Sequence, residues 1–405
     1  MTNSNDSSSS LIRNQLLPKE EMLETGKPKM KLKIGVPREN QKIENRVALT
    51  PESIEILVNK GHEVFVESDA GKQASYSNKK YSDHGAIVVA DKSEVYRCDI
   101  ILKVAPMTIE EADLLTSAQL IISSLHFNEN LEGYIKKLME KKATAIAFEN
   151  LKDDDNLYTI DRTMSEISGA TAILIAAEYL SNIHEGKGVY LGGITGITPA
   201  EVVIIGAGTT GEYAAKAAIG LGAQVKVFDN SNIKLRKLQN NIGQRVFTSV
   251  IHNKVLEKAL SSADVVIGAL PPHEIGMKYI VSEKMIKKMK EGSVVIDLTI
   301  DHGGCFETSE CRTHQNPVFK KFGVIHYCVP NIPSRVARTA SIALSNVFVP
   351  LLLSIDEYGG IKYLLQNDMG VRHSVYLYNG ILTNLFIGEK LGIPSKDITL
   401  LMAAF

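Results

Sequence analysis

Short apolar runs alternate with amphipathic stretches from Lys31 onward, and this pattern is the main guide to the fold. Five apolar runs have the length of buried strands, and they lie at residues 33–36, 63–66, 100–104, 120–123 and 143–148. Between the first two runs, Thr50 and Pro51 form a typical helix start, and the helical pattern continues as far as Gly61. Strands that alternate with helices indicate a parallel sheet with helices on both faces. The first part of the chain is therefore predicted to be an α/β domain.

A second α/β unit is predicted after a long helical pattern at residues 165–180 and a glycine-rich stretch at residues 192–196. Its predicted strands lie at residues 202–205, 225–228, 265–268, 294–297 and 323–327. After Asn331 the pattern is helical, first over residues 341–355 and then in shorter helices up to Phe405. These C-terminal helices are expected to have no sheet of their own and to cross back onto the first domain.

The predicted strand at residues 202–205 leads directly into Gly206, Gly208 and Gly211, which have G-x-G-x-x-G spacing. A helical segment follows, and the next strand ends on Asp229, 18 residues beyond the last glycine. Such a turn lets backbone N–H groups approach a pyrophosphate, and the helix N-terminus adds partial positive charge. A carboxylate at the end of the second strand can bind ribose hydroxyls and would repel a 2′-phosphate. The segment therefore predicts a site for NAD rather than NADP.

Together these patterns predict an α/β protein of two doubly wound, Rossmann-like domains, with a cleft between them and a discontinuous first domain. The predicted substrate domain, which would carry the catalytic residues, comprises residues 31–160 and 338–405. The predicted NAD-binding domain comprises residues 161–337. Residues 1–30 are polar and rich in Ser, Asn, Lys and Glu, so a flexible tail is expected there.

Composition excludes several classes of protein. The 405 residues carry a net charge of -1, which offers no basic surface for nucleic acid or an anionic membrane. No apolar run reaches the ~18–20 residues that span a bilayer, and the N-terminal segment lacks the apolar core of a signal peptide. We therefore expect a cytoplasmic protein that acts on a small molecule and has no nucleic-acid or membrane partner.

The four cysteines form no C-x-x-C pair, so reduced thiols are expected. Cys305 and Cys311 lie near His302 and His314 in the sequence, but their spacing fits no common zinc pattern. No metal is therefore expected.

Polar residues just beyond predicted strands are the first candidates for chemistry, because ligands of doubly wound sheets bind at the C-terminal ends of strands. Four such residues are Arg46, Lys103, His126 and Asp301. Arg46 can bind a carboxylate with two hydrogen bonds, and Lys103 can bind a carboxylate or polarise a carbonyl. His126 titrates near neutral pH and is the natural proton carrier, whereas Asp301 can orient a water molecule or an amine. Taken singly, each residue also has an ordinary structural explanation.

Seven separated motifs together resemble the alanine dehydrogenase / pyridine nucleotide transhydrogenase family, most of all its alanine dehydrogenases. In chain order they are Arg46–Pro51, Lys103, Leu125–His126, Thr163–Glu166, the turn Gly206–Gly211, Ile300–Glu307 and Val329–Pro333. The resemblance extends from about Lys31 to the C-terminus. It implies an NAD-dependent enzyme that deaminates L-alanine oxidatively and reversibly to pyruvate and ammonia. It also implies a homo-oligomer, specifically a hexamer.

The resemblance implies a role for each candidate residue. Arg46 and Lys103 would bind the substrate carboxylate and carbonyl, and His126 and Asp301 would be the catalytic pair. Eleven residues would bind the cofactor, from its phosphates to its adenosine and along its path: Ser165, Gly206, Gly208, Thr209, Thr210, Gly211, Asp229, Lys234, Leu270, Leu298 and Asn331.

Four segments depart from the usual pattern of the family. Lys103 is followed by Val-Ala-Pro where family members usually read V-K-E-P, so this loop is one residue shorter. Ser124 stands where a tyrosine is common, and His302 stands inside the D-Q-G-G pattern. A different, shorter loop occupies residues 270–276. Because all four polar candidates are present, catalysis is expected, with differences in loop closure and substrate fit.

Three alternatives stay open at this point. One is the NAD(H)-binding subunit of a transhydrogenase, and another is a related dehydrogenase for a different amino acid such as saccharopine or lysine. The third is a regulator that binds NAD without catalysis. An assay of NADH formation across a panel of amino acids separates all three from an alanine dehydrogenase.

Overall fold

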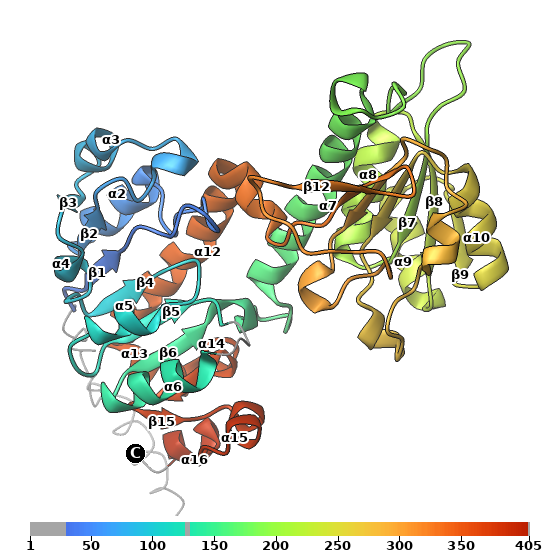
Figure 1. Ribbon diagram of the computed structural model, residues 1–405. Coiled ribbons are helices and arrows are strands. Elements are labelled where there is room, and N and C mark those ends of the chain that lie inside the picture. The colour runs from blue at the N-terminus through green and yellow to red at the C-terminus, as the bar shows by residue number, and fades with distance from the viewer. Residues whose placement is uncertain (1–29, 126–129, 404–405) are drawn as a thin grey trace, which may run out of the picture.

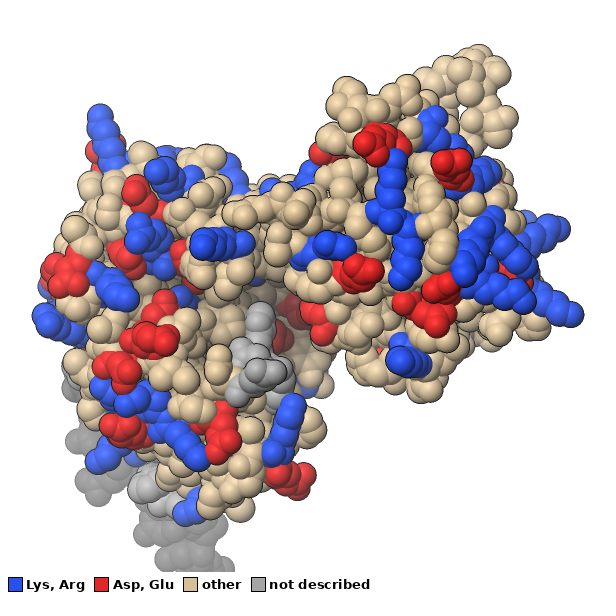
Figure 2. Space-filling view, viewed as in Figure 1, with Lys and Arg blue, Asp and Glu red and all other residues tan. Residues whose placement is uncertain are grey.

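Two α/β lobes make up the computed structural model, which describes residues 30–125 and 130–403 (Figure 1). The chain passes between the lobes twice, along α7 (Thr159–Leu180) and again at η6 (Ile332–Val336), which leads into α12 (Ala337–Glu357). Figure 2 shows a hollow between the lobes. The predicted tail at residues 1–30 lies outside the described residues, apart from Met30.

An eight-stranded sheet forms the first lobe, in the order β15-β14-β6-β5-β4-β1-β2-β3. Its six parallel strands are β1 (Lys33–Val36), β2 (Glu63–Glu67), β3 (Ile87–Val89), β4 (Ile100–Leu102), β5 (Leu120–Ser123) and β6 (Thr144–Ala147). β4, β5 and β6 are buried along their whole length, as expected for a parallel sheet covered by helices. The five predicted strands are confirmed, whereas β3 was missed because only one of its three residues is buried.

Helices cover both faces of this sheet (Figure 1). The first of them, α2, begins as predicted, because the Thr50 hydroxyl accepts a hydrogen bond from the Ser53 amide and Pro51 occupies the first turn. The remaining helices and 3₁₀ turns of the lobe complete the covering layers. With α2 (Pro51–Asn59) they are η1 (Lys72–Ala74), α3 (Asn78–Asp83), α4 (Lys92–Val95), α5 (Ile109–Asp113), α6 (Leu131–Glu140), η2 (Phe148–Asn150), α13 (Ile361–Asn367), α14 (Met369–His373), α15 (Leu385–Leu391) and α16 (Ile398–Ala403).

The C-terminal part of the chain returns to the first lobe, as predicted, and it also extends the sheet. β14 (Val375–Tyr378) pairs antiparallel with β6, and β15 (Ile381–Leu382) pairs antiparallel with β14. This part therefore has no sheet of its own, as predicted, but the helical pattern predicted after Asn331 missed these two strands. Its strands are too short for a periodic signal, although all four residues of β14 are buried.

The long helix α12 lies in the core of the first lobe, where Leu344, Phe348, Leu352 and Ile355 are buried. By length and composition alone, the stretch Ile332–Glu357 could cross a membrane, so the expectation that no apolar stretch reaches this length is wrong. Half of its apolar window is buried inside the protein. Packing in the lobe accounts for the buried half of these residues.

A seven-stranded sheet forms the second lobe, in the order β12-β13-β11-β10-β7-β8-β9. Its strands are β7 (Glu201–Ile205), β8 (Gln224–Asp229), β9 (Phe247–Val250), β10 (Val265–Gly268), β11 (Val294–Asp297), β12 (Val318–Lys321) and β13 (Val324–Tyr327), of which only β12 runs antiparallel. The other helical elements of this lobe are η3 (Asn182–His184), α8 (Thr209–Gly220), α9 (Asn232–Ile242), α10 (Asn253–Ser262), η4 (Pro272–Ile275), α11 (Glu283–Ile286) and η5 (Ile300–His302).

Both sheets have the strand order of a doubly wound fold, with the order reversing beside β1 in one lobe and beside β7 in the other. The fold class is thus confirmed, with a first lobe built from two separate parts of the chain. The predicted domain bounds at residues 160 and 338 fall within the crossing helices α7 and α12 and stay a prediction. Ligands of such sheets bind where the strand order reverses, which directs attention to the space between the lobes.

Candidate active site

A cavity of about 440 Å³ lies between the lobes and is lined by residues of both. Ten of the predicted site residues line it: Arg46, Ser165, Gly208, Thr209, Thr210, Lys234, Leu270, Leu298, Asp301 and Asn331. Lys103, Gly206, Gly211 and Asp229 do not line it. His126 lies outside the described residues. The two lobes thus bring most of the predicted set to one place.

The glycine turn at the end of β7 has the geometry of a phosphate site. Gly206 has a φ of 117°, which side chains rarely tolerate. A Cβ on Gly211 would lie 1.9 Å from the Gly206 carbonyl oxygen, so α8 can begin directly against the turn only because this residue is glycine. A Cβ on Gly208, in contrast, would meet no atom within 4 Å. This open space at a helix N-terminus, where the first N–H groups lack intrahelical partners, fits a phosphate group.

Helix α7 brings Ser165 to the same turn. A Cβ on Gly169, one helical turn beyond Ser165, would lie 2.1 Å from the Thr210 carbonyl oxygen. α7 and α8 therefore touch backbone to backbone. This contact explains why a hydroxyl from α7 lines the cavity together with Thr209 and Thr210.

Asp229 ends β8, as predicted, and its carboxylate binds the glycine turn. It is fully buried, and its two carboxylate oxygens accept hydrogen bonds from the Ala207 amide (2.7 Å) and the Ser231 amide (2.8 Å). It thereby ties the glycine turn to the end of β8. The predicted contact of Asp229 with ribose hydroxyls stays a prediction.

An ion pair crosses the rim of the cavity on the second lobe. The Lys234 ammonium on α9 lies 3.5 Å from the Glu274 carboxylate on η4, and both side chains are about half exposed. Exposed pairs of this kind contribute at most about 1 kcal/mol to stability. A ligand that binds beside Leu270 can therefore separate this pair at little cost in free energy.

Arg46 is held rigidly at the wall of the first lobe. Its Nε and Nη2 donate to the two carboxylate oxygens of Glu44 at 2.8 and 2.7 Å, and Nη1 contacts the Met164 sulfur at 3.3 Å. Asn331, from the crossing segment before η6, donates to the same Glu44 carboxylate at 2.8 Å. Burial alone would raise the pKa of Glu44, but the bonds from Arg46 and Asn331 outweigh it and lower that pKa. The pair is therefore charged, and it fixes the direction of the guanidinium.

Asp301 stands on the opposite wall, on the 3₁₀ turn η5 after β11. The buried Asp297 carboxylate organises this loop, because it accepts hydrogen bonds from the Thr299 amide (3.0 Å), the Cys305 amide (2.9 Å) and the Ser309 hydroxyl (2.5 Å). The side chains of Asp301 and His302 are more than half exposed toward the cavity, with 4.0 Å between their carboxylate and imidazole. A carboxylate on a fixed loop can thus face a ligand bound between the lobes.

Lys103 does not reach this cavity. Its side chain is only 2% exposed, and its ammonium lies 3.2 Å from the Glu39 carboxylate and 3.1 Å from the Glu111 carboxylate. Burial opposes the charge on Lys103, but the two carboxylates outweigh it and raise the pKa of the ammonium. Lys103 is therefore a charged, internal group that joins the loop after β1 to α5.

The segment that leads to His126 rests on Glu149. The Leu125 amide donates to the Glu149 carboxylate at 2.8 Å, and the second carboxylate oxygen is buried without a partner among the described residues. Burial raises the pKa of Glu149 to about 7. Glu149 lies in η2, directly after β6, and belongs to no recognisable motif, so it was not predicted.

Two further acids and a thioether line the cavity and were not predicted: Asp161, Glu274 and Met164. The pKa of Asp161 is raised, chiefly by desolvation and also by Asp301, while His302 opposes the shift. An acid in the first turn of a helix has an ordinary explanation in the helix dipole. The sequence therefore carried no signal that Asp161 faces the site.

No metal centre is visible in residues 30–125 and 130–403, which contain no group of three or more His, Cys, Asp or Glu side chains suited to hold an ion. Cys305 is fully buried, and Cys311 is exposed. Both thiols are free, as are those of Cys98 and Cys328.

Known proteins resemble this chain along most of its length. Residues 35–168 match the family model of the alanine dehydrogenase/PNT N-terminal domain, and residues 172–385 match that of the C-terminal domain. The alanine dehydrogenase of Staphylococcus saprophyticus is 36% identical over 366 residues, covering 90% of this chain and 98% of the relative. That of Methanococcus maripaludis is 39% identical over 363 residues, covering 89% and 97%.

A solved structure of an L-alanine dehydrogenase superposes with a TM-score of 0.81 at 34% identity, covering 88% of this chain and 98% of that one. The superposed region extends over both lobes. The chain belongs to the alanine dehydrogenase/PNT family.

Proposed function

We propose that the protein catalyses the reversible oxidative deamination of L-alanine with NAD. In balanced form, L-alanine, NAD⁺ and water give pyruvate, ammonium, NADH and a proton. The observation that carries this proposal is that Arg46 and Asp301, from different lobes, face one cavity that also contains the glycine turn. A 2-amino acid needs this set, namely a cation for its carboxylate, a carboxylate near its amino group and a nucleotide site beside both. The curated relatives named alanine dehydrogenase support the same reaction.

Arg46 binds the substrate carboxylate in this proposal. A guanidinium has five N–H donors, and the described contacts with Glu44 and Met164 use three of them. One donor on each terminal nitrogen is left, which suits a carboxylate bound by two parallel hydrogen bonds. Lys103 is engaged by Glu39 and Glu111, so the proposal gives it the task of fixing the loop after β4.

The cofactor site fits NAD. The open space at Gly208 and the hydroxyls of Ser165, Thr209 and Thr210 would hold its phosphates. Lys234 would bind its adenosine end, and Leu270, Leu298 and Asn331 would line its path. When bound, NAD supplies the acceptor for the hydrogen on the substrate Cα. Asp229 is proposed to favour NAD, because a buried carboxylate behind the turn repels a 2′-phosphate.

Proton transfer is assigned to His126 and Asp301. His126 takes the proton from the water that attacks the substrate imine, and Asp301 orients that water and the amino group. Such a relay typically contributes about 10²–10⁴-fold to the rate.

The test is NADH formation by the full chain with L-alanine, with NAD and NADP compared. We expect Asp301→Asn and His126→Ala to lower kcat by at least about 10²-fold, with little change in NADH binding. Asp154→Asn, which alters an exposed acid outside the cavity, is the matched control. NADH binding without turnover of any amino acid would refute the proposal and favour a regulator. A requirement for a second nucleotide would instead favour a transhydrogenase subunit.

We further propose a homo-hexamer in the cytoplasm. Ile183, Tyr190, Ile194 and Ile197 are large apolar residues that are exposed on the segment from η3 to β7. This segment projects from the second lobe (Figure 1), and exposed apolar groups of this kind favour an interface between copies. The four free thiols support a reducing compartment. Light scattering of the purified protein tests the oligomeric state.

A further inference from the structure

Two imidazoles meet at the wall that the second lobe contributes to the interlobe cavity. His302 lines the cavity on η5, and His273 lies on the neighbouring turn η4, with 5.8 Å between the ring centroids. Both side chains are exposed, that of His302 by 59%. His302 stands where the family pattern usually has a glutamine. Histidine gains and loses a proton near neutral pH, whereas glutamine does not ionise, so this position differs in chemistry from the usual pattern.

His302 is held beside the proposed catalytic carboxylate of Asp301. Its Nε2 lies 4.0 Å from an Asp301 carboxylate oxygen. This distance exceeds a hydrogen bond, but both side chains are more than half exposed, so rotation of either one closes the gap. The backbone beneath them is fixed, because the His302 amide donates to the Thr299 carbonyl at 2.9 Å and the Thr299 amide donates to Asp297 at 3.0 Å. The imidazole and the carboxylate therefore stay within reach of each other.

Other charged groups face this pair. Asp161 faces it from the first turn of α7, and the ion pair of Lys234 with Glu274 lies at the rim. Desolvation and, to a smaller extent, Asp301 raise the pKa of Asp161, while His302 acts in the opposite direction. The charges of the two aspartates and His302 are thus coupled, and a proton that moves among them is felt by all three.

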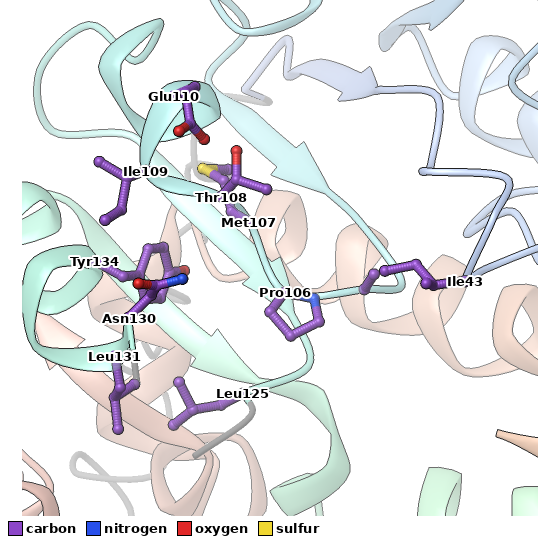
Figure 3. A pocket seen from close by; sticks show the side chains of 11 residues that line it. Ile43, Pro106, Met107, Thr108, Ile109, Glu110, Leu125, Asn130, Leu131 and Tyr134 are labelled. Carbon is purple, nitrogen blue, oxygen red and sulfur yellow. The ribbon is translucent and has the colours of Figure 1, made fainter. Parts of the chain in front are cut away.

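A second cavity, of about 360 Å³, lies within the first lobe and has no such group (Figure 3). Its described lining is mainly apolar and contains no histidine, and its ionisable side chains are those of Glu110 and Tyr134. The interlobe cavity, in contrast, brings Asp161, Asp301 and His302 together. The interlobe cavity is therefore the place for proton chemistry on a bound ligand.

Oxidative deamination has to release one proton. The substrate nitrogen enters as an ammonium and must lose a proton before the hydrogen on Cα can leave with its electron pair. The later steps release no further proton in net, because the proton that His126 takes from water returns to the leaving nitrogen. Substrate and NAD that fill the cavity displace water from Asp301. The proton then needs a route to bulk water.

We propose that His302 carries this proton out of the site, acting through Asp301 and assisted by His273. The ammonium N–H bond breaks, its electron pair stays on the nitrogen, and the proton goes to the Asp301 carboxylate. Asp301 passes it to His302, where a new N–H bond forms on the ring, and His273 or a buffer base accepts it next. The inference rests on the proposed function and adds a second proton carrier to it.

The test is His302→Gln, which places the usual family residue at this position. In dilute buffer, kcat for alanine with NAD should fall by at least about tenfold, while the KD of NADH stays within about twofold. Added imidazole should restore kcat of this variant and leave the wild type unchanged, because a free base replaces the missing carrier. His252→Gln, at an exposed histidine that does not line the cavity, is the matched control and should behave as the wild type.

Two further variants show whether the route passes through Asp301. In an Asp301→Asn background, His302→Gln should add less than about a twofold loss, because the carrier has no carboxylate to serve. His273→Gln should cause a smaller loss than His302→Gln, and imidazole should repair it. A wild-type kcat in His302→Gln, or a lowered kcat that imidazole does not raise, would overturn the inference while alanine turnover by the wild type upholds the proposed function. If the wild type turns over no amino acid, the proposed function fails, and this inference fails with it.

Discussion

The Gly211→Ala substitution tests the packing of the glycine turn most directly. An alanine Cβ would lie 1.9 Å from the Gly206 carbonyl oxygen, and real Cβ contacts are essentially never shorter than 3.0 Å. The start of α8 must therefore move by about 1.1 Å, the difference between these two distances. Overpacking costs about 1–3 kcal/mol, against a gain of up to about 1 kcal/mol from Ala in a helix. We expect a net loss of about 1–2 kcal/mol, or roughly 2–8 °C in Tm.

The same movement displaces the N–H groups that would bind phosphate, so NADH affinity should fall about 10–100-fold. Thermal unfolding and fluorescence titration with NADH measure the two effects. Gly220→Ala is the control, because it places the same methyl group at the end of the same helix with no atom within 4 Å. Gly208→Ala also meets no atom, so it should keep the wild-type Tm while weakening NADH binding. A wild-type Tm and NADH affinity in Gly211→Ala would refute the reasoning.

Three further predictions concern buried charged groups. The pKa of Glu149 is about 7 in the folded protein and 4.5 in its ordinary state. As the pH rises from 4.5 to 8, the unfolded chain therefore loses this proton before the folded protein does, and the free energy of unfolding should fall by up to about 3 kcal/mol. Glu149→Gln should abolish this fall in urea titrations. Lys103→Met should lower the free energy of unfolding by about 3–5 kcal/mol, because it leaves buried carboxylates without their cation. Adding Glu39→Gln to this variant should restore part of the loss. A Lys103→Met variant of wild-type stability with a greatly raised KM for alanine would instead place Lys103 in the site. Asp297→Asn should lower kcat about tenfold or more by loosening the loop of Asp301, while the KD of NADH stays within about twofold; unchanged kcat would contradict this.

The sequence predicted best those strands that are buried on both faces. The strands at residues 265–268 and 294–297 agree with the structure to the residue, because unbroken apolar runs between turn residues leave no other interpretation. β9 and β12 were missed because they are edge strands with no fully buried residue. A strand that is half exposed and four residues long has no periodic signal to detect.

The candidate site was harder to predict, because the partner of a charged residue is invisible in the sequence. Lys103 follows a buried strand, as a ligand-binding lysine would, but its ammonium is taken by Glu39, which is distant in the chain, and by Glu111. Asp229 ends the second strand as expected, but its oxygens bind the turn itself. The positions of Lys103 and Asp229 at the ends of strands could be predicted from the sequence. Their hydrogen-bond and ion-pair partners could not.

The discontinuous first lobe has a consequence for synthesis on the ribosome. β6 ends at Ala147, and its neighbour β14 ends at Tyr378, 231 residues later by subtraction. At about 5–20 residues per second, the edge of β6 waits roughly 10–50 s for its partner. The whole second lobe emerges during this interval and can fold first. The lobe that starts the chain is therefore the last to be finished, and its open edge needs protection from neighbouring nascent chains until then.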